Sequence, residues 1–520
     1  MLQWGGCAMS MAKVCSMGIN GIDGYIISVE TDLSNGLPAF DIVGLPDASV
    51  KESKERVRAA VKNSGFNIPV KRITVNLAPA DRKKEGAAYD LPITVAILSA
   101  SEQIPEGSAD NCAFLGELSL DGTLRGINGI LPMVIAARDN GIKTVFLPIE
   151  NANEAAVVND IEIIGAENIS QIVNHLKGEE ILPPTKIDID EIFMHNCEYS
   201  VDFSDVKGQR SVKRAIEVAV AGGHNIIMIG SPGSGKSMLA QRIPTILPPL
   251  TFDEALETTK VHSIAGVLEP GTSLVTTRPF RSPHHTVSPI GLIGGGTNPK
   301  PGEVSIAHNG VLFLDELPEF QRLAIEVLRQ PLEDGVVSIT RANASYTYPS
   351  NILLVASMNP CKCGYYGDPN HECTCTPPQI QKYMGKISGP MLDRIDIHVE
   401  VPAVSYSDLS SDSAEEKSSE IKRRVEKARK IQHDRYKDEG IYTNSQLSAS
   451  LIRKYCHITP EINDILKSAF DNLGLSARAH DRILKVARTI ADLDGEQEIS
   501  VSHIAEAIQY RSLDRKFWGA

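Results

Sequence analysis

The most informative segment of the sequence is NIIMIGSPGSGKSMLAQRI, residues 225–243. Its centre, residues 230–237, fits the pattern GxxxxGK[ST], with an apolar run before it and a helix-like run after it. A phosphate-binding loop requires this strand–loop–helix context. Glycines let backbone N–H groups approach phosphate oxygens, and the start of the helix adds a partial positive charge. The segment therefore predicts a nucleotide phosphate site.

The predicted phosphate loop consists of Gly230, Ser231, Pro232, Gly233, Ser234, Gly235, Lys236 and Ser237. Within it, Lys236 is expected to reach the β- and γ-phosphates of ATP. The hydroxyl of Ser237 is expected to hold Mg²⁺. ATP and Mg²⁺ are accordingly the predicted cofactors.

A second apolar run, VLFLDE at residues 311–316, ends in two carboxylates about 75 residues after the phosphate loop. A buried strand delivers its end to the edge of an open α/β sheet, where ligands bind. There Asp315 can hold Mg²⁺ through water, and Glu316 can polarise the water that attacks the γ-phosphate. A pair of acids after a strand is common, so the prediction depends on the phosphate loop. Together the two motifs indicate ATP hydrolysis rather than ATP binding alone.

A third run, ILLVASMN at residues 352–359, ends in Asn359. An asparagine at the end of a strand is usually a turn former. Beside the other two elements we favour another role, in which its amide hydrogen-bonds the γ-phosphate and the attacking water. Near-continuous apolar strands that alternate with helices are typical of a parallel sheet covered on both faces. The predicted fold class is therefore α/β.

The composition bounds the kind of protein. The chain has 520 residues, of which 42% are hydrophobic, and its net charge is −13, from 52 Lys+Arg against 65 Asp+Glu. This length suggests two to four domains. It contains no run of 18 or more apolar residues and no secretory signal, so we expect a cytoplasmic protein without membrane contact. The acidic total disfavours nucleic-acid binding by the bulk surface, although local patches such as the basic stretch 48–84 remain candidates.

Shifts in pattern divide the chain. We predict an N-terminal domain at 11–177 with β-rich runs and helices, in which Pro46-Asp47 begins a helix that ends near Gly65. A connector containing a proline pair follows at 178–198, and the predicted ATPase core spans 199–402. A polar connector then precedes a helical domain at 418–515.

Long phrases of the sequence resemble the magnesium-chelatase-like AAA+ ATPases, in the ComM/YifB group. The phrases are DFSDVKGQRSVKRAIEVAVAGGHNIIMIGSPGSGKS, PFRSPHHTVSPIGLIGGGTNPKPGEVSIAHNGVLFLDELPEF and SGPMLDRIDIHVEV. The resemblance covers nearly the whole chain. It implies an AAA+ core with a C-terminal helical lid, a homo-hexameric ring around a pore, and an ATP-driven motor that translocates on DNA in branch migration. The alternative is a motor that remodels a protein partner without DNA.

The resemblance also assigns roles to single residues. Arg394 matches the family's arginine finger, which reaches the γ-phosphate bound by the neighbouring subunit. Arg478 matches the sensor arginine of the lid, with Arg482 as an alternative. The segment between the phosphate loop and Asp315 resembles an insertion that forms hairpins lining the pore. It contains Arg278, Arg281, His284, His285, Gly294, Gly295, Gly296 and Lys300, and we interpret the two histidines as hairpin residues.

GELSLDGTLRGINGILPMVIAARDNGIKTVFLP, residues 116–148, resembles the α+β proteolytic domain of Lon-type proteases, which uses a serine nucleophile and a lysine base. In this chain Ala88 stands at the nucleophile position and Leu131 near the lysine position. Alanine has no oxygen to attack a carbonyl, and leucine cannot accept a proton. We therefore predict a non-peptidase domain with a scaffold or DNA-contacting role, which disfavours a protease-linked unfoldase.

Four of the nine cysteines form two close pairs with nine residues between the pairs, namely Cys361, Cys363, Cys373 and Cys375. Four thiolates suit tetrahedral Zn²⁺, although a single residue between paired cysteines is shorter than the usual spacing. His371 is an alternative ligand, and reduced thiols or a redox pair are the alternative to zinc. A metal here would brace the loop that follows Asn359.

Overall fold

The computed structural model describes residues 10–195, 199–296, 299–341, 344–404, 415–473, 477–513 and 517–518. The chain divides into two compact units. The first unit consists of Met1–His195 and Ala255–Val275, and the second of Asn196–Glu254 and Thr276–Ala520. The predicted core at 199–402 therefore differs from the second unit by one internal segment, since Ala255–Val275 packs with the N-terminal residues. Most of the polar connector expected after residue 402 lies outside the described residues.

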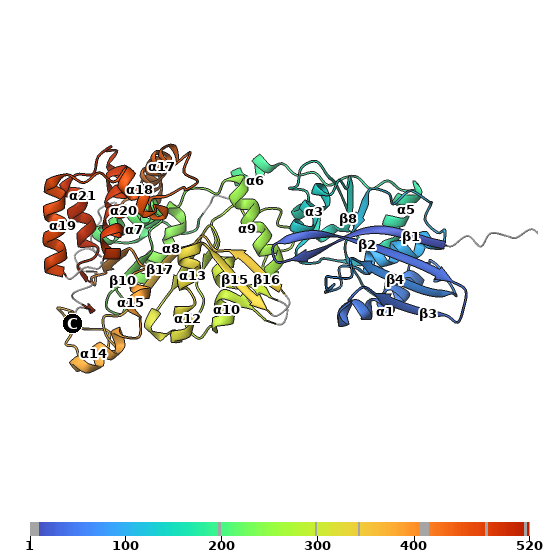
Figure 1. Ribbon diagram of the computed structural model, residues 1–520, viewed down its shortest axis with the longest axis horizontal. Coiled ribbons are helices and arrows are strands. Elements are labelled where there is room, and N and C mark those ends of the chain that lie inside the picture. The colour runs from blue at the N-terminus through green and yellow to red at the C-terminus, as the bar shows by residue number, and fades with distance from the viewer. Residues whose placement is uncertain are drawn as a thin grey trace, which may run out of the picture. The chain divides into compact units, whose positions relative to one another are not determined.

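The first unit is built on a seven-stranded mixed sheet with the order β3-β4-β2-β1-β5-β8-β9. Its strands are β1 (Ser10–Asn20), β2 (Asp23–Ser34), β3 (Ala39–Val43), β4 (Arg72–Ala78), β5 (Cys112–Phe114), β8 (Thr144–Pro148) and β9 (Glu162–Ala166), and a small hairpin pairs β6 (Glu117–Leu118) with β7 (Leu124–Arg125). β1 and β2 form an antiparallel hairpin, drawn as long blue strands in Figure 1, in which Asn20 pairs with Asp23. Gly21, at φ +67°, supplies the left-handed conformation that a tight hairpin turn needs.

The helices of the first unit are α1 (Ala48–Asn63), α2 (Asp90–Ala100), α3 (Ile130–Asp139), α4 (Ile149–Ala155), α5 (Ile169–Lys177), α6 (Ile189–His195) and most of α9 (Phe252–Ala265). α1 begins where the sequence predicts. The side chain of Asp47 accepts the N–H of Val50 at 2.7 Å, which satisfies one of the unpaired donors at a helix start. Val57 and Val61 are fully buried on the inner face of this helix.

The second unit is built on a five-stranded parallel sheet with the order β11-β14-β17-β10-β18. The strands are β11 (Phe280–Arg281), β14 (Val311–Leu314), β17 (Leu353–Met358), β10 (Ile226–Ile229) and β18 (Ile397–Glu400). Every residue of β10, β14 and β17 is buried. The predicted α/β class is confirmed, because apolar runs of this kind form strands covered on both faces.

Helices cover this sheet, and two small hairpins extend from it. The helices are α7 (Arg210–Gly222), α8 (Lys236–Ile246), α10 (Pro289–Ile293), α11 (Glu303–Ile306), α12 (Arg322–Glu326), α13 (Arg329–Asp334), α14 (Pro377–Met384) and α15 (Gly389–Leu392), with 3₁₀ turns η1 (Phe203–Asp205) and η2 (Leu317–Glu319). The hairpins pair β12 (Gly294–Gly295) with β13 (Lys300–Pro301), and β15 (Val336–Arg341) with β16 (Ala344–Pro349).

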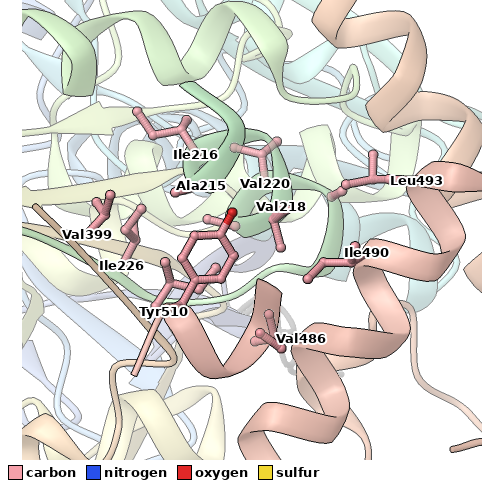
Figure 2. Close-up of a cluster of buried hydrophobic side chains, with 14 of the residues drawn as sticks. Ala215, Ile216, Val218, Val220, Ile226, Val399, Val486, Ile490, Leu493 and Tyr510 are labelled. Atoms are coloured by element: carbon pink, nitrogen blue, oxygen red, sulfur yellow. The ribbon is translucent and has the colours of Figure 1, made fainter. Parts of the chain in front are cut away.

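The C-terminal helices complete the second unit. They are α17 (Ser418–Arg435), α18 (Ala449–Tyr455), α19 (Pro460–Leu473), α20 (Ala477–Asp494) and α21 (Val501–Gln509), with the short turn η3 (Asn444–Gln446). One hydrophobic cluster joins them to the sheet, as Figure 2 shows for Ile216 of α7, Ile226 of β10, Val399 of β18 and Ile490 of α20. The predicted helical lid is therefore packed on the parallel sheet through a shared hydrophobic cluster. Among the described residues, no helix has the length and apolar character needed to span a membrane.

Candidate nucleotide site and cysteine cluster

The three predicted motifs meet at one edge of the parallel sheet. β14, β17 and β10 are neighbours, so the residues that follow each strand lie side by side. These are the phosphate loop after β10, Asp315 after β14 and Asn359 after β17. Motifs far apart in the sequence are therefore brought into one site by parallel strand order.

Lys236 lies at the centre of this site. Its Nζ donates to the carbonyl oxygens of Gly230 at 2.8 Å and Ser231 at 2.9 Å, and to Oδ1 of Asn359 at 3.3 Å. Burial lowers the pKa of this amine, whereas Asp315 and Glu316 act in the opposite direction. The ammonium thus sits among oxygen acceptors, where a phosphate group would supply stronger ones.

Asp315 is held by hydroxyl groups on both sides. Oγ of Ser237 donates to its Oδ2 at 2.7 Å, and Oγ of Ser357 donates to its Oδ1. Carboxylate and hydroxyl oxygens are the hard ligands that Mg²⁺ prefers, so this donor set fits a magnesium ion that also binds nucleotide phosphates. Ser357 is absent from the predicted site, although its place on β17, two residues before Asn359, was an available signal.

Glu316 adopts an unusual backbone conformation, with φ +54° and ψ +48°. A non-glycine residue in this left-handed region is strained by about 1–2 kcal/mol, and such residues are concentrated at functional sites. Its N–H donates to Oδ1 of Asp315 at 3.0 Å, and its side chain remains 56% exposed. At this exposure a water molecule can approach the carboxylate.

A histidine pair adjoins Glu316. Nδ1 of His285 lies 3.9 Å from Oε2 of Glu316, and the rings of His284 and His285 are 4.1 Å apart. The sequence places these residues in a pore hairpin, whereas the structure puts His285 beside the acid predicted to activate water. Only the tertiary contact reveals this, because the sequence separation of 31 residues carries no recognisable spacing.

Arg394, the predicted arginine finger, pairs with a residue of its own chain. Its side chain is 7% exposed, and its Nη2 forms an ion pair with Glu333. Nη1 donates to the carbonyl of Pro390 at 2.6 Å, and Nε is buried without a hydrogen-bond partner among the described residues. The guanidinium is thus only partly satisfied where it lies.

The two candidate sensor arginines differ in their surroundings. Nη1 of Arg482 lies 2.7 Å from Oδ1 of Asp396, and Nδ1 of the buried His224 lies 3.3 Å from Oδ2 of the same carboxylate. Burial raises the pKa of Asp396, but the charge of Arg482 outweighs this effect and holds the pKa far below its ordinary value. Arg478 is 63% exposed and lies 3.6 Å from Oδ2 of Asp393. Arg482 therefore serves the packing of α20, and Arg478 is the more accessible of the two.

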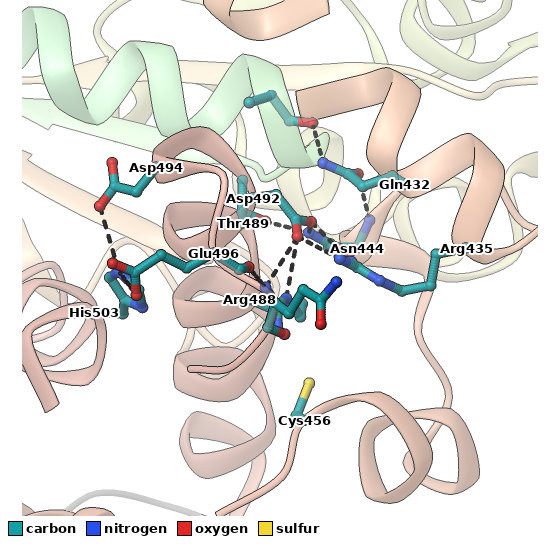
Figure 3. Close-up of polar contacts among 12 residues, drawn as sticks. Gln432, Arg435, Asn444, Cys456, Arg488, Thr489, Asp492, Asp494, Glu496 and His503 are labelled. Carbon is teal, nitrogen blue, oxygen red and sulfur yellow. Dashed lines mark hydrogen bonds and ion pairs between the residues drawn. The ribbon is translucent and has the colours of Figure 1, made fainter. Parts of the chain in front are cut away.

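A buried polar network holds α20 in place (Figure 3). The carboxylate of Asp492, fully buried, accepts hydrogen bonds from Arg435 at 2.5 and 2.9 Å, from Asn444 at 2.9 Å and from Arg488 at 3.2 Å. Thr489, on the same helix, lies 2.8 Å from Nε2 of His224. A buried carboxylate with several charged donors is costly to disrupt, so the helix that carries Arg478 is firmly positioned.

Two arginines of the segment expected to line the pore are hydrogen-bonded within the second unit. Arg278 donates to the carbonyl oxygens of Pro248 and Asn309, and Arg281 donates to both carboxylate oxygens of Glu303 at 2.7 and 2.8 Å. These cations brace the insertion. A third, Lys300 on β13, is exposed.

The four clustered cysteines come together as the sequence predicts. Sγ of Cys361 lies 3.2 Å from that of Cys363 and 3.7 Å from that of Cys373, and all four sulfurs lie within 4.8 Å of one another. A zinc ion with Zn–S bonds of about 2.3 Å requires sulfurs about 3.8 Å apart. The described cysteines are free thiols, which leaves these four sulfurs available as ligands.

The thiols of this cluster are electrostatically linked. Burial opposes ionisation of Cys363, but a backbone N–H from Tyr365 and the Cys361 thiol lower its pKa to about 5. A backbone N–H of Cys375 favours ionisation of Cys373, yet burial and its contact with Cys363 raise the pKa of this thiol to about 12. One thiolate therefore forms at the expense of others, and a divalent cation is what would stabilise all four.

The two residues predicted to stand at the Lon dyad positions are buried in the first unit. Leu131 is fully buried, and its N–H donates to Oε1 of Glu154 at 3.1 Å. Ala88 is 7% exposed, and its carbonyl accepts the N–H of Gly116 at 3.0 Å. These two side chains supply neither a nucleophilic oxygen nor a proton acceptor.

The basic stretch 48–84 is less basic at the surface than its composition indicates. Arg56 pairs with the buried Asp90 at 2.6 Å. Lys84 is fully buried, and its Nζ donates to the carbonyls of Pro79 and Arg82. Two of its cations therefore serve the fold of the first unit.

Three family profiles match this chain. They are described as magnesium chelatase, subunit ChlI (residues 202–409), subunit ChlI of Mg-chelatase (29–151) and the C-terminal part of subunit ChlI (415–511). The chain is 43% identical over 509 residues to the competence protein ComM of Haemophilus influenzae, and 42% identical over 510 residues to the YifB protein of Escherichia coli, with 98% of each chain covered. It is also 29% identical over 168 residues to the Lon protease of Mycoplasma mobile, covering 30% of this chain and 20% of that one.

Proposed function

This chain belongs to the magnesium-chelatase-like AAA+ family of ComM and YifB, and from that premise we propose that it is an ATP-hydrolysing ring motor that translocates on DNA. Its work would be branch migration of recombination intermediates in natural transformation. The convergence of Lys236, Asp315 and Asn359 at one sheet edge carries the ATPase part of the proposal. Full-length similarity to a competence protein supports the DNA part.

The proposed hydrolytic step uses the groups gathered at this sheet edge. The phosphate loop binds the triphosphate, and Lys236 moves from its carbonyl partners to the β- and γ-phosphates. Ser237 and Asp315 would hold Mg²⁺, which neutralises developing charge when bound. Glu316 takes the proton of the attacking water, and Asn359 orients that water from the end of β17. The imidazole of His285, 3.9 Å from Oε2 of Glu316, is a polar neighbour of this carboxylate.

Completion of the site requires a second subunit. Arg394 would leave Glu333 and reach the γ-phosphate bound next door, where its charge stabilises the transition state. Arg478 on α20 would report nucleotide state to the helical lid. An arginine supplied in trans demands a closed ring, and the proposed assembly is a homo-hexamer.

The proposed DNA contact lies on the two hairpins of the second unit. Nη2 of Arg341 on β15 donates to the carbonyl of Gly296 beside β12, and the hydroxyl of Tyr348 on β16 donates to that of Pro299 at 2.8 Å. These two bonds join the hairpins to each other. Exposed Lys300 and Arg341 are their cations for a phosphate backbone, since Arg281 is engaged by Glu303.

The four clustered cysteines are proposed to hold structural Zn²⁺. The spacing of their sulfurs matches a tetrathiolate site. Metal analysis of protein purified without chelator tests this. One zinc per chain is expected, and a ratio near zero would remove the metal.

The decisive experiment measures ATP turnover without DNA and with single-stranded, duplex and branched DNA. Several-fold stimulation by single-stranded or branched DNA is expected. Indifference to all three would favour the alternative, ATP-driven remodelling of a protein partner. That alternative has its own support, because the matching family profiles describe a chelatase subunit.

Hairpin variants locate the contact. Lys300→Ala and Arg341→Ala should each reduce DNA stimulation and flatten its salt dependence while leaving turnover without DNA unchanged. Lys430→Ala, at an exposed position of α17, is the matched control and should change neither. Equal loss in all three variants would show that general charge, rather than the hairpins, attracts DNA.

A further inference from the structure

The cysteine-bearing segment 361–375 reaches the phosphate loop directly. It starts two residues after Asn359, at the end of β17, the strand beside β10. Between the cysteine pairs it has no regular secondary structure. We call residues 361–375 the cysteine loop. This loop makes two contacts with the phosphate loop, one with each of two consecutive residues.

The first contact is a hydrogen bond. Oγ of Ser231 donates to Oδ2 of Asp368 at 2.5 Å, and the Asp368 side chain is only 3% exposed. The other carboxylate oxygen accepts the N–H groups of Asn370 at 2.8 Å and His371 at 3.1 Å. The carboxylate is thus fixed by its own loop and presents a rigid acceptor to the phosphate loop.

The second contact is steric. Gly364 adopts φ +92°, and a Cβ added there would lie 2.6 Å from both Cγ and Cδ of Pro232. No side chain fits at this distance, so the cysteine loop packs backbone to ring against the phosphate loop. Ser231 and Pro232 are therefore both held from outside the motif to which they belong.

The position of Asp368 in the sequence gives a way in which a metal on the thiols would restrain it. Asp368 is five residues from both Cys363 and Cys373, at the midpoint of the segment that the two thiols would close. An irregular segment of this length is costly to order, and a tie between its ends removes much of that conformational freedom. A metal on the four sulfurs would therefore place Asp368 where Ser231 meets it.

We infer that Asp368 is a positioning residue for ATP binding, and that metal on the four thiolates sets nucleotide affinity through it. The inference rests on the proposed magnesium–ATP and zinc sites. Without the metal the cysteine loop loosens, Ser231 loses its acceptor, and the phosphate loop must be ordered by the nucleotide itself. Affinity for ATP falls, whereas the hydrolytic step in the bound state does not change.

The test compares zinc content, the Kd of a fluorescent ATP analogue with Mg²⁺, and the KM and kcat of the ATPase. Asp368→Ala should keep its zinc and lose roughly tenfold in affinity, the size expected when a hydrogen bond to a charged group is removed. KM should rise in parallel, with kcat within about twofold of the native value. Glu372→Ala, which removes an exposed acid from the same loop, is the control and should match the native protein.

Two further variants separate the parts of the proposal. Ser231→Ala removes the donor without touching the cysteine loop, so its combination with Asp368→Ala should be no weaker than either alone. Cys373→Ser should lose zinc and weaken nucleotide binding at least as much as Asp368→Ala. Native affinity in Asp368→Ala, or additive losses in the double variant, would overturn the positioning role. Native affinity in zinc-free Cys373→Ser would overturn the link to metal.

The underlying sites fail separately. Native protein that binds no nucleotide would contradict the ATP site, and the binding signal of Lys236→Ala defines the level that counts as no binding. Native protein that carries no zinc would contradict the zinc site and the control of nucleotide affinity by metal. In that case Asp368→Ala would still test whether the hydrogen bond between Asp368 and Ser231 supports ATP binding. A fall in kcat with unchanged KM in Asp368→Ala would contradict the inference, because a residue that only positions the phosphate loop acts on binding.

Discussion

The two sheets of this chain differ in what they carry at the positions where related proteins perform chemistry. The parallel sheet of the second unit gathers Lys236, Asp315 and Asn359 at the ends of adjacent strands. The first unit has sequence similarity to a Lon protease, and Ala88 and Leu131 are the residues that we predict at its nucleophile and base positions. Similarity in sequence thus transfers the fold, whereas chemistry is kept only where particular atoms are kept.

The largest expected effect concerns the arginine that would complete the parallel-sheet site in trans. Arg394→Ala should lower ATP turnover by about 10³ or more, because the transition state loses a positive charge. Mixing Arg394→Ala subunits with Lys236→Ala subunits should restore part of the activity, since some interfaces then combine an intact phosphate loop with an intact arginine. No recovery at any ratio, with assembly intact, would contradict a shared site.

A somewhat smaller loss is expected at the acid that activates water. Glu316→Gln should reduce kcat by roughly 10²–10³ and leave the Kd for ATP close to native, because general base catalysis contributes about this much. Binding of a fluorescent nucleotide and single-turnover hydrolysis measure the two quantities. Normal turnover in this variant would show that Glu316 is not the base, and the chemical difference between the two units would then be smaller than proposed.

In the first unit the equivalent change should affect stability instead of chemistry. Leu131→Ala should destabilise the unit by about 3 kcal/mol, because a fully buried leucine is replaced by a cavity. Hydrogen exchange of the α3 amides measures this, with nucleotide affinity expected to stay native. Leu120→Ala, at a position 58% exposed, is the control and should change stability by less than about 0.5 kcal/mol. Equal protection in both variants would show that Leu131 is not part of the core.

The smallest effect is expected when an oxygen is returned to the nucleophile position. Ala88→Ser should change stability by less than about 1 kcal/mol and produce no cleavage of fluorogenic peptides, since Leu131 offers no proton acceptor. Measurable peptide turnover would mean that another group serves as base, and the first unit would then be a latent peptidase.

Local patterns allowed much of the fold to be predicted. The strand before the phosphate loop, the helix that begins at Lys236, and the Asp47 cap of α1 all follow from residues within a few positions of one another. Backbone hydrogen bonding in helices and caps is short in range, and so is the burial period that marks a strand. Such features can be predicted from neighbouring residues alone.

Partners across long separations were beyond prediction. The contacts of His285 with Glu316 and of Asp368 with Ser231 depend on which strand ends and loops become neighbours. The transfer of Ala255–Val275 to the first unit is of the same kind. No spacing rule relates these residues, because their distances in space are set by sheet order and packing rather than by chain separation.

The amino-acid sequence by itself contains the phosphate-loop pattern, the two acids after β14 and the two close pairs of cysteines, and it carries the prediction that the Lon dyad is absent. Each of these is a matter of which atoms the chain has at adjoining positions. Only the tertiary structure decided that the cysteine loop presses on Ser231 and Pro232, and that Arg394 rests on Glu333. The reason is physical: a side chain's chemistry is inherent in its type, whereas its partner is chosen when distant segments pack into one close-fitting interior.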